Sequence, residues 1–310
     1  MNAFGRTDRL LLGIDGGGSK CRARLCTLSG ARLGEGTGGP ANIRLGLDQS
    51  FASIFQATTQ CMSQAGLSPS DFGRIVACLA LAGASEPSEL DAARRRKLPF
   101  GKAIFATDAQ AACVGAHGGH NGGIIVVGTG SIGWGELDGQ VHRIGGWGWP
   151  ISDEGSGAWL GCEALRRSLW AHDGRIPWTP LLSSLFEKFR SDPHAIVRWM
   201  SGAMPRDFAT FAPAIVEHAS ANDPVAVELM RLAAGHIDAL ARRLVAFGVD
   251  RLCLAGSLAA AIEPWLEETT QHHLVAPLGD PVDGALQLAR DAAGSDSDSI
   301  VSSRPWAPSA

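Results

Sequence analysis

Two short segments of the chain combine glycine with hydroxyl residues in a way that suits a phosphate-binding turn. The first reads Gly16-Gly17-Gly18-Ser19-Lys20 and the second Gly128-Thr129-Gly130-Ser131, and each follows an apolar run that indicates a buried strand. The first is neither a P-loop nor a dinucleotide motif, because Lys20 does not directly follow the last glycine and Cys21 replaces a third glycine. We predict two β-hairpin turns whose exposed backbone N–H groups face phosphates, with a plain hairpin turn as the alternative.

Two acidic residues stand at the ends of predicted strands. Asp15 ends the strand before the first turn, where its carboxylate could hold a metal ion through water. Asp108 lies between a buried strand and a helix of small residues, a junction at which α/β proteins gather ligands. The alternative for Asp108 is the N-cap of that helix. We favour a functional role, because the small residues around Asp108 leave room for a ligand.

Residues 145–157 are dense in glycine, tryptophan and acids, with Trp147, Trp149 and Asp153 among them. Tryptophan faces pack against the CH faces of sugar rings and carboxylates accept hydroxyl protons, so this segment predicts a sugar site. The alternative is that Asp153 caps the following helix and the tryptophans fill the core. A further turn, Gly256-Ser257, ends an apolar run and could pass close to a nucleobase or ribose, or could merely end the strand.

Composition excludes several classes of protein. The chain has 310 residues with 27 basic and 31 acidic side chains, a net charge of −4, which argues against bulk electrostatic binding of nucleic acid or anionic membrane. Its 39 glycines have no collagen-like period and fall in clusters. The seven cysteines are scattered singly, as reduced thiols are, and the N-terminus lacks the pattern of a signal peptide. We therefore expect a soluble cytoplasmic protein without membrane or nucleic-acid partners.

The predicted elements occur in the same order twice along the chain. Each half reads as three strands, a helix, a strand, a helix, a strand and a helix, and the second half carries a long, mainly helical insertion over residues 178–247. In the second half, the last predicted elements before the final helix are a helix over residues 258–271 and a strand over residues 273–276. This order predicts an α/β protein with two similar domains, each a mixed five-stranded sheet flanked by helices.

The domain limits follow from this repeat. We place the first domain at residues 1–118 and the second at residues 119–294, with the option that a last helix at about residues 283–293 packs back on the first domain. Residues 295–310 are rich in Ser, Asp and Pro and are predicted to be a disordered tail.

Taken in order, the glycine turns, the Asp108 junction, the 145–157 segment and the Gly256 turn resemble the acetate-kinase, hexokinase, actin and Hsp70 superfamily. Within it, the chain is similar to the N-acetylglucosamine and glucosamine kinase branch of the BadF/BadG/BcrA/BcrD ATPases, from about residue 11 to residue 293. The resemblance implies two ribonuclease-H-like (actin-like ATPase) domains and an ATP- and Mg²⁺-dependent kinase acting on the 6-hydroxyl of N-acetylglucosamine or glucosamine. A homodimer is common in this branch.

The resemblance also implies a role for each motif. Asp108 is then the base near the sugar 6-hydroxyl, and Asp15 belongs to the water shell of Mg²⁺. The implied sugar contacts are Asn42, Asp108, Ser131, Gly146, Trp147 and Asp153. The implied contacts of ATP are Gly16, Gly17, Gly18, Ser19, Lys20, Gly128, Thr129, Gly130, Gly256 and Ser257. One departure is Ser152, which stands where many members have glycine.

The expected mechanism is phosphoryl transfer, in which positioning and neutralisation of charge dominate because the transition state is loose. Closure of the two domains should expel water, which would otherwise compete as the acceptor. Two alternatives stay open. One is an activator ATPase of a CoA-ester reductase or dehydratase, for which Cys113 and Cys162 would be the candidate iron–sulfur ligands. The other is a non-catalytic, sugar-sensing regulator of the same fold.

Overall fold

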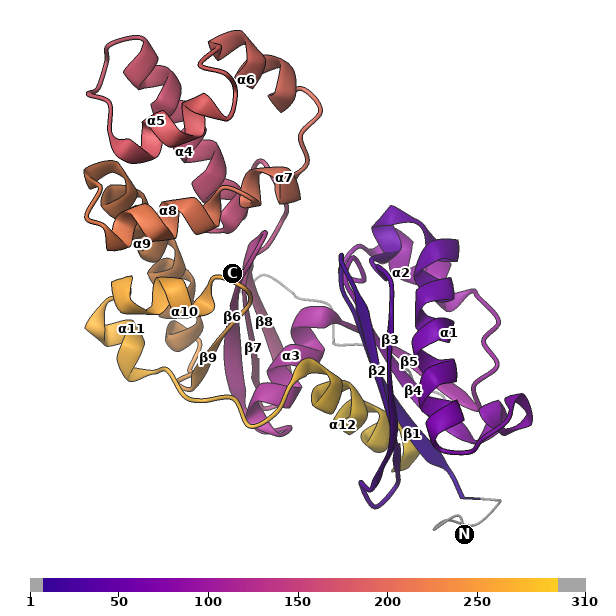
Figure 1. The fold of residues 1–310 in the computed structure, drawn as a ribbon. Coiled ribbons are helices and arrows are strands. Elements are labelled where there is room, and N and C mark those ends of the chain that lie inside the picture. Colours follow the sequence, from indigo (N-terminus) through magenta and orange to yellow (C-terminus); the bar gives the residue numbers. More distant parts are fainter. Residues whose placement is uncertain (1–7, 295–310) are drawn as a thin grey trace. The chain divides into compact units, whose positions relative to one another are not determined.

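The structure is a computed structural model that describes residues 8–294, the side chain of Leu45 excepted. Two compact units form, and each is described by itself. Unit 1 contains the chain up to Asn121 and again from Ala276, whereas unit 2 contains Gly122–Val275 (Figure 1). Residues 8–294 form one five-stranded sheet and one four-stranded sheet, both mixed and flanked by helices, which confirms the predicted α/β class. The predicted disordered tail, residues 295–310, lies outside the described residues.

The sheet of unit 1 has the strand order β3-β2-β1-β4-β5. Its strands are β1 (Leu10–Gly16), β2 (Cys21–Thr27), β3 (Arg32–Gly38), β4 (Ile75–Leu81) and β5 (Lys102–Thr107). The first three form an antiparallel meander, and β4 and β5 run parallel to β1. β4 is buried along its whole length, as expected for a central parallel strand covered on both faces.

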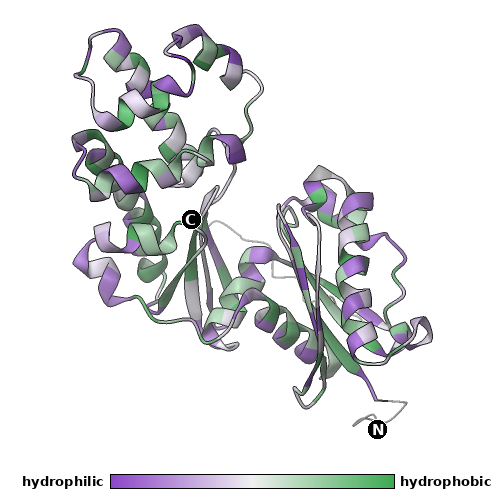
Figure 2. Cartoon of the chain, in the orientation of Figure 1, coloured by the Kyte–Doolittle hydropathy of each residue, from purple (hydrophilic) through white to green (hydrophobic). Residues whose placement is uncertain are grey.

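Helices cover both faces of this sheet. α1 (Leu47–Gln64) packs against one face, where Leu10, Leu12 and Ile14 point toward Phe51 and Ile54. α3 (Asp108–His117) and α12 (Pro281–Gly294) cover the other face (Figure 1). The short α2 (Pro87–Arg94) and the 3₁₀ turns Ile43–Leu45 and Pro69–Arg74 lie in the connections. Figure 2 shows hydrophobic and hydrophilic residues mixed along α1, as expected for a helix with one buried and one exposed face.

α12 brings the end of the described chain into unit 1, beside β1, β4 and α3. Its contact with α3 is close, since a Cβ on Gly284 would lie 1.9 Å from the carbonyl oxygen of Ala111. Only glycine allows two helix backbones to approach to this degree. The residues before α12 therefore lie on the sheet face that α12 covers. Side chains of β1 and β2 that point to this face can contact them.

Unit 2 is built on a sheet with the strand order β8-β7-β6-β9. Its strands are β6 (Gly122–Val127), β7 (Ser131–Leu137), β8 (Gln140–Gly145) and β9 (Leu252–Ala255), with β6 and β9 parallel. The predicted helical insertion forms between β8 and β9. α4 (Gly157–His172) precedes the predicted range of 178–247, and the helices within that range are α5 (Pro180–Glu187), α6 (Pro193–Met200), α7 (Pro205–Ala209), α8 (Ala212–Ser220) and α9 (Pro224–Ala246).

Two predictions about unit 2 were wrong. The strand predicted at residues 273–276 is only an isolated bridge between Leu252 and Leu274, so the second sheet has four strands within the described residues. Two backbone hydrogen bonds, both to Leu252, pair this segment with β9, and Pro277, which has no N–H to donate, follows at once. The helix predicted at residues 258–271 is broken into α10 (Ala259–Ile262), a 3₁₀ turn (Glu263–Trp265) and α11 (Glu268–His272). Pro264 explains the break, because it lacks the N–H that a continuous helix needs.

Candidate active site

The first glycine turn joins β1 to β2 in unit 1. The N–H of Gly17 donates to the carbonyl oxygen of Lys20 over 2.9 Å, which closes the hairpin. A Cβ on Gly18 would meet no atom within 4 Å, and Ser19 and Lys20 are exposed. The turn therefore presents accessible backbone, as the predicted phosphate contact requires.

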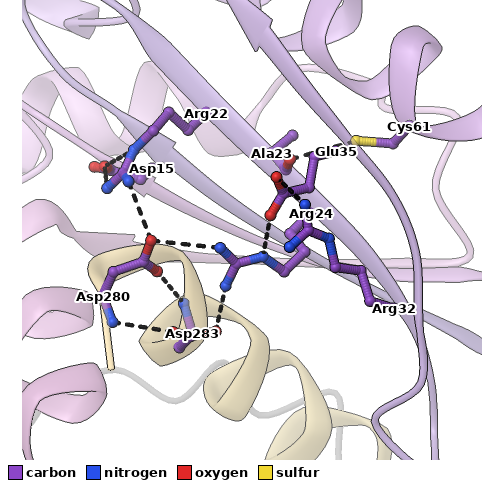
Figure 3. A network of polar contacts seen from close by, with 9 residues as sticks. All are labelled: Asp15, Arg22, Ala23, Arg24, Arg32, Glu35, Cys61, Asp280 and Asp283. Carbon is purple, nitrogen blue, oxygen red and sulfur yellow. Dashed lines mark hydrogen bonds and ion pairs between the residues drawn. The ribbon is translucent and has the colours of Figure 1, made fainter. Parts of the chain in front are cut away.

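Asp15, the acid at the end of β1, lies opposite Arg22 of β2 in the antiparallel pair. Arg22 donates from Nη2 to Asp15 Oδ2 over 2.8 Å and from Nε to the same oxygen over 3.3 Å (Figure 3). Both contacts fall on one oxygen of the carboxylate. Asp15 can therefore still offer Oδ1 to the hydration shell of a metal ion, so the chemistry of this acid fits the predicted Mg²⁺.

Asp108 follows β5 at the carboxyl edge of the sheet. The register pairs Gly16 with Leu81 and Leu81 with Thr107, so β1, β4 and β5 end at one level. Thr107 is the N-cap of α3, since its Oγ1 accepts the N–H of Gln110 over 3.0 Å. The N-cap interpretation of Asp108 was therefore wrong. The Asp108 carboxylate is exposed, and its Oδ1 accepts the N–H of Ala109 over 2.9 Å.

Asn42 lies at this same edge. The N–H of the preceding residue, Ala41, donates to the carbonyl oxygen of Gly17 over 2.9 Å. The Asn42 Oδ1 accepts the N–H of Arg44 over 3.0 Å and would lie 2.8 Å from a Cβ on Gly83, just after β4. Unit 1 thus gathers the first glycine turn, Asn42 and Asp108 at the carboxyl ends of its parallel strands.

The second glycine turn joins β6 to β7 in unit 2 and lies against the N-terminus of α4. The N–H of Gly128 donates to the Gly130 carbonyl oxygen over 2.9 Å, and the carbonyl oxygen of Gly128 accepts the N–H of Gly157 over 2.8 Å. Ser131 is buried, and its Oγ donates to the carbonyl oxygen of Glu154 over 2.7 Å. The Ser131 side chain therefore joins the turn to the loop that precedes α4.

Asp153 belongs to that loop and lies against the second turn. A Cβ on Gly130 would be 3.0 Å from the Asp153 carboxyl group. Burial raises the pKa of Asp153, and the backbone N–H groups of Ser131 and Trp149 and the charge of Arg143 oppose this shift only in part. Asp153 has a positive φ of 73°, which a tightly packed loop can hold in place. The helix cap is Ser156, whose Oγ accepts the N–H of Trp159, so Asp153 is not the cap.

The two tryptophans of this loop have different environments. Trp147 is 65% exposed, and the Arg143 guanidinium lies over its ring at 4.2 Å from the centroid. Trp149 packs on Phe208 in the core of unit 2, with 5.2 Å between ring centroids. The Ser152 hydroxyl accepts the N–H of Trp147 over 3.3 Å. Ser152, which stands where many members have glycine, therefore helps to hold the loop. Trp147 therefore suits a ligand contact and Trp149 fills the core.

The backbone around Trp147 is held as well. Arg143 donates to the carbonyl oxygen of Gly146, whose φ is +66°. A Cβ on Gly146 would lie 2.7 Å from the Ile132 side chain, so a larger residue would displace the loop.

Gly256 and Ser257 follow β9 and lie beside the second turn. Gly256 has a φ of +99°, and a Cβ there would lie 2.4 Å from the carbonyl oxygen of Val127. That carbonyl also accepts the N–H of Leu258 over 3.0 Å. Both residues are exposed. Because β6 and β9 are parallel neighbours, the second turn and the Gly256 turn leave the sheet at the same edge.

The structure thus collects the predicted residues into two groups, one in each unit. Unit 1 holds Asp15, Gly16, Gly17, Gly18, Ser19, Lys20, Asn42 and Asp108. Unit 2 holds Gly128, Thr129, Gly130, Ser131, Gly146, Trp147, Asp153, Gly256 and Ser257. Sequence reasoning missed Arg22 and Arg143. The alternation of Arg22 and Arg24 with apolar residues could have indicated that both arginines point to one face of the sheet.

No group of three His, Cys, Asp or Glu side chains within residues 8–294 could hold a metal ion by its own ligands. Cys113 is buried, with 1% of its surface exposed, and Cys162 is half-buried. Within the same residues, no helix is both long enough and apolar enough to cross a membrane.

Comparison with known proteins gives the family. The chain is 41% identical to the glucosamine kinase GspK of Vibrio cholerae, over 90% of this chain and 95% of that protein. It is 30% identical to an N-acetylmuramic acid/N-acetylglucosamine kinase of Clostridium acetobutylicum, over 73% of this chain and 76% of that one. A solved structure of a candidate N-acetylglucosamine kinase from Chromobacterium violaceum shares 34% identity and a TM-score of 0.85, over 91% of this chain and 99% of that one. The model of the BadF/BadG/BcrA/BcrD ATPase family matches residues 12–289, and the chain belongs to that family.

Proposed function

We propose that this chain is an amino-sugar kinase that transfers the terminal phosphoryl group of ATP to the 6-hydroxyl of glucosamine or N-acetylglucosamine. The observation that carries the proposal is the exposed Asp108 carboxylate at the carboxyl end of β5, with the helix cap supplied separately by Thr107. The names of the relatives support the substrate class, since glucosamine and N-acetylglucosamine are both represented among them.

The nucleotide would be bound by backbone and hydroxyl groups of both glycine turns. In unit 1 these are the N–H groups of residues 16–20 and the Ser19 hydroxyl. In unit 2 they are residues 128–130, with Gly256 and Ser257 toward the adenosine. The close approach of Gly256 to the Val127 carbonyl supports a backbone contact there, because no side chain fits at that position.

Asp15 would belong to the water shell of Mg²⁺. When bound, the ion neutralises charge on the transferred phosphate. Arg22 occupies Asp15 Oδ2, so the carboxylate would act through its other oxygen. A single carboxylate is sufficient, because Mg²⁺ in kinases takes most of its ligands from phosphates and water.

The sugar would be held by polar and aromatic side chains among the candidate site residues of unit 1 and unit 2. Asn42 and Asp108 would contact hydroxyls from unit 1, and the exposed ring of Trp147 would lie against the apolar face of the sugar. Asp153 and Ser131, joined through the backbone of the same loop, would accept and donate hydrogen bonds in unit 2. Gly146 keeps the Trp147 backbone in place.

Asp108 would orient the 6-hydroxyl and accept its proton as the bond to phosphorus forms. In a loose transition state little negative charge must be created on the attacking oxygen before transfer, so orientation matters more than basicity. The N–H of Ala109, which donates to Asp108 Oδ1, helps to fix the direction of the carboxylate.

The test is ADP release by the purified wild-type chain in the presence of Mg²⁺ and ATP, with a panel of sugars. We expect release to depend on glucosamine or N-acetylglucosamine, with much lower rates for glucose and none above background without sugar. ADP release that is independent of every sugar would contradict the proposal and would be the result expected of an activator ATPase. The absence of ADP release with every sugar, together with sugar binding, would be the result expected of a regulator.

A further inference from the structure

The Arg22 side chain in unit 1 contacts two carboxylates, those of Asp15 and Asp280. Its guanidinium donates to Asp15 Oδ2 through Nη2 and Nε, and its Nη1 donates to Asp280 Oδ2 over 3.1 Å (Figure 3). Arg22 and Asp15 are direct neighbours in the β1–β2 pair, whereas Asp280 comes 258 residues later. One side chain therefore connects the acid beside the first glycine turn to the residue that precedes α12.

Asp280 is itself fixed by the start of α12. Its Oδ1 accepts the N–H of Asp283 over 3.0 Å, and its own N–H donates to Asp283 Oδ2 over 3.0 Å, which is the reciprocal pattern of a capping box. Its Oδ2 accepts from Arg22 and, over 3.4 Å, from Arg24. Burial alone would raise the pKa of Asp280, but the helix N–H groups and the two guanidinium charges outweigh it and lower the pKa. Asp280 is thus a rigid, charged anchor for Arg22.

We propose that Arg22 is a positioning residue that holds Asp15 for Mg²⁺ and fixes it to the anchor at Asp280. Because Arg22 binds a single oxygen of Asp15, it restricts the carboxylate to one orientation and leaves the other oxygen to the metal's water shell. Groups that orient a metal-side carboxylate typically change metal affinity when they are removed. This proposal rests on the proposed kinase function.

Asp280 also lies at a particular point along the chain. Residues 276–280 return the chain from unit 2 to unit 1, and α12 begins directly after them. Arg22 therefore connects Asp15 to Asp280, the last residue of this segment before α12.

Arg24 provides a matched control. It lies two residues along β2, on the same face, and it also contacts Asp280, together with Glu35 and Asp283 (Figure 3). Its side chain is 19% exposed, against 33% for Arg22, and it makes more ion pairs. Within the part of the chain that the structure describes, the ion pairs of Arg24 are with Glu35, Asp280 and Asp283 and not with Asp15. If the arginines act only by stabilising unit 1, Arg24→Gln should be at least as harmful as Arg22→Gln.

The experiment measures binding of a non-hydrolysable ATP analogue by calorimetry across a range of Mg²⁺ concentrations, without turnover. We expect Arg22→Gln to need roughly 10- to 100-fold more Mg²⁺ for half-maximal binding. Its affinity for the metal-free analogue should stay within about twofold of wild type, which is a small change in the free energy of binding. Arg24→Gln should keep the wild-type Mg²⁺ requirement, even if its melting temperature falls further. Arg22→Lys, which can hold one carboxylate but not both in a fork, should be intermediate and serves if Arg22→Gln does not fold.

An unchanged Mg²⁺ requirement in Arg22→Gln would overturn the proposal, and so would an equal shift in Arg24→Gln. An equal loss of binding with and without Mg²⁺ would also overturn it, because Arg22 would then contact the nucleotide itself. Failure of the wild-type chain to bind the analogue at any Mg²⁺ concentration would instead count against the proposed kinase function.

Discussion

The two glycine turns have similar sequences but different neighbours. The turn of residues 17–20 follows a strand that ends in Asp15-Gly16, and it is open at Gly18, where a Cβ would meet no atom within 4 Å. The turn of residues 128–130 follows a strand that ends in two valines, and it lies against α4 and against the carboxyl group of Asp153.

This difference separates two kinds of acid. Asp15 is held by a guanidinium on the adjacent strand, which donates two hydrogen bonds to a single oxygen of its carboxylate. Asp153 is brought by a loop into partial burial, where the charged form is disfavoured and the pKa rises. A glycine turn therefore does not define its own chemistry. The elements packed beside it decide whether the nearby acid suits a metal ion or a neutral, hydroxyl-bearing ligand.

The largest effect is expected at Asp108, which would act on the reacting hydroxyl on the side of the first turn. Asp108→Asn keeps the size of the side chain and an oxygen for the Ala109 N–H but removes the proton acceptor. We expect kcat to fall by roughly 10²- to 10⁴-fold, the usual contribution of a general base. The matched variant Asp153→Asn should mainly raise the KM for the sugar, measured in the same assay. Near-wild-type turnover in Asp108→Asn would show that this carboxylate is not the base.

The next largest effect is expected from alanine substitutions in the two glycine turns. Neither Gly18 nor Gly130 is among the described glycines with positive φ, so alanine suits the backbone at both. A Cβ at residue 130 must displace the Asp153 carboxyl group, which would lie 3.0 Å away, whereas a Cβ at residue 18 has open space. We expect Gly130→Ala to raise the sugar KM about 10-fold, which corresponds to ~1.4 kcal/mol, and Gly18→Ala to leave it within about twofold. Equal effects on the sugar KM would remove the distinction between the turns.

The smallest effect is a pH dependence of stability. Burial raises the pKa of Asp153 above its ordinary value of 3.8, so the folded chain binds more protons than the unfolded chain just above that pH. Stability from this group is therefore present at low pH and is lost as the pH rises through the raised pKa. In urea unfolding between about pH 3 and pH 7, the wild type should lose stability relative to Asp153→Asn as the pH rises. A constant difference over this range would mean that the carboxyl group is not desolvated.

Much of the fold could be predicted because its signals are local. Apolar runs such as residues 75–81 lie within one element, so the sequence alone places them. The fifth strand of the second sheet was predicted wrongly because only a single residue of it, Leu274, pairs with a neighbour. A short apolar segment does not reveal how much of it will pair.

The candidate site was predictable to a similar degree. Turn residues and strand-end acids can be read from spacing, but Arg22 could not be assigned, because its partner Asp280 is 258 residues away and depends on how α12 packs. The separate environments of Trp147 and Trp149 also depend on packing, since Phe208 in the helical insertion covers only the second ring. Long-range contacts of this kind have no local signature.

The most direct test of the central claim is identification of the product formed from ATP and each amino sugar by the wild-type chain, with phosphorus–proton correlation NMR to locate the phosphate. The account predicts a sugar phosphate esterified at oxygen 6, formed in equal amount to ADP, from glucosamine or N-acetylglucosamine. Inorganic phosphate in place of a sugar ester, or an ester at any other oxygen, would contradict it.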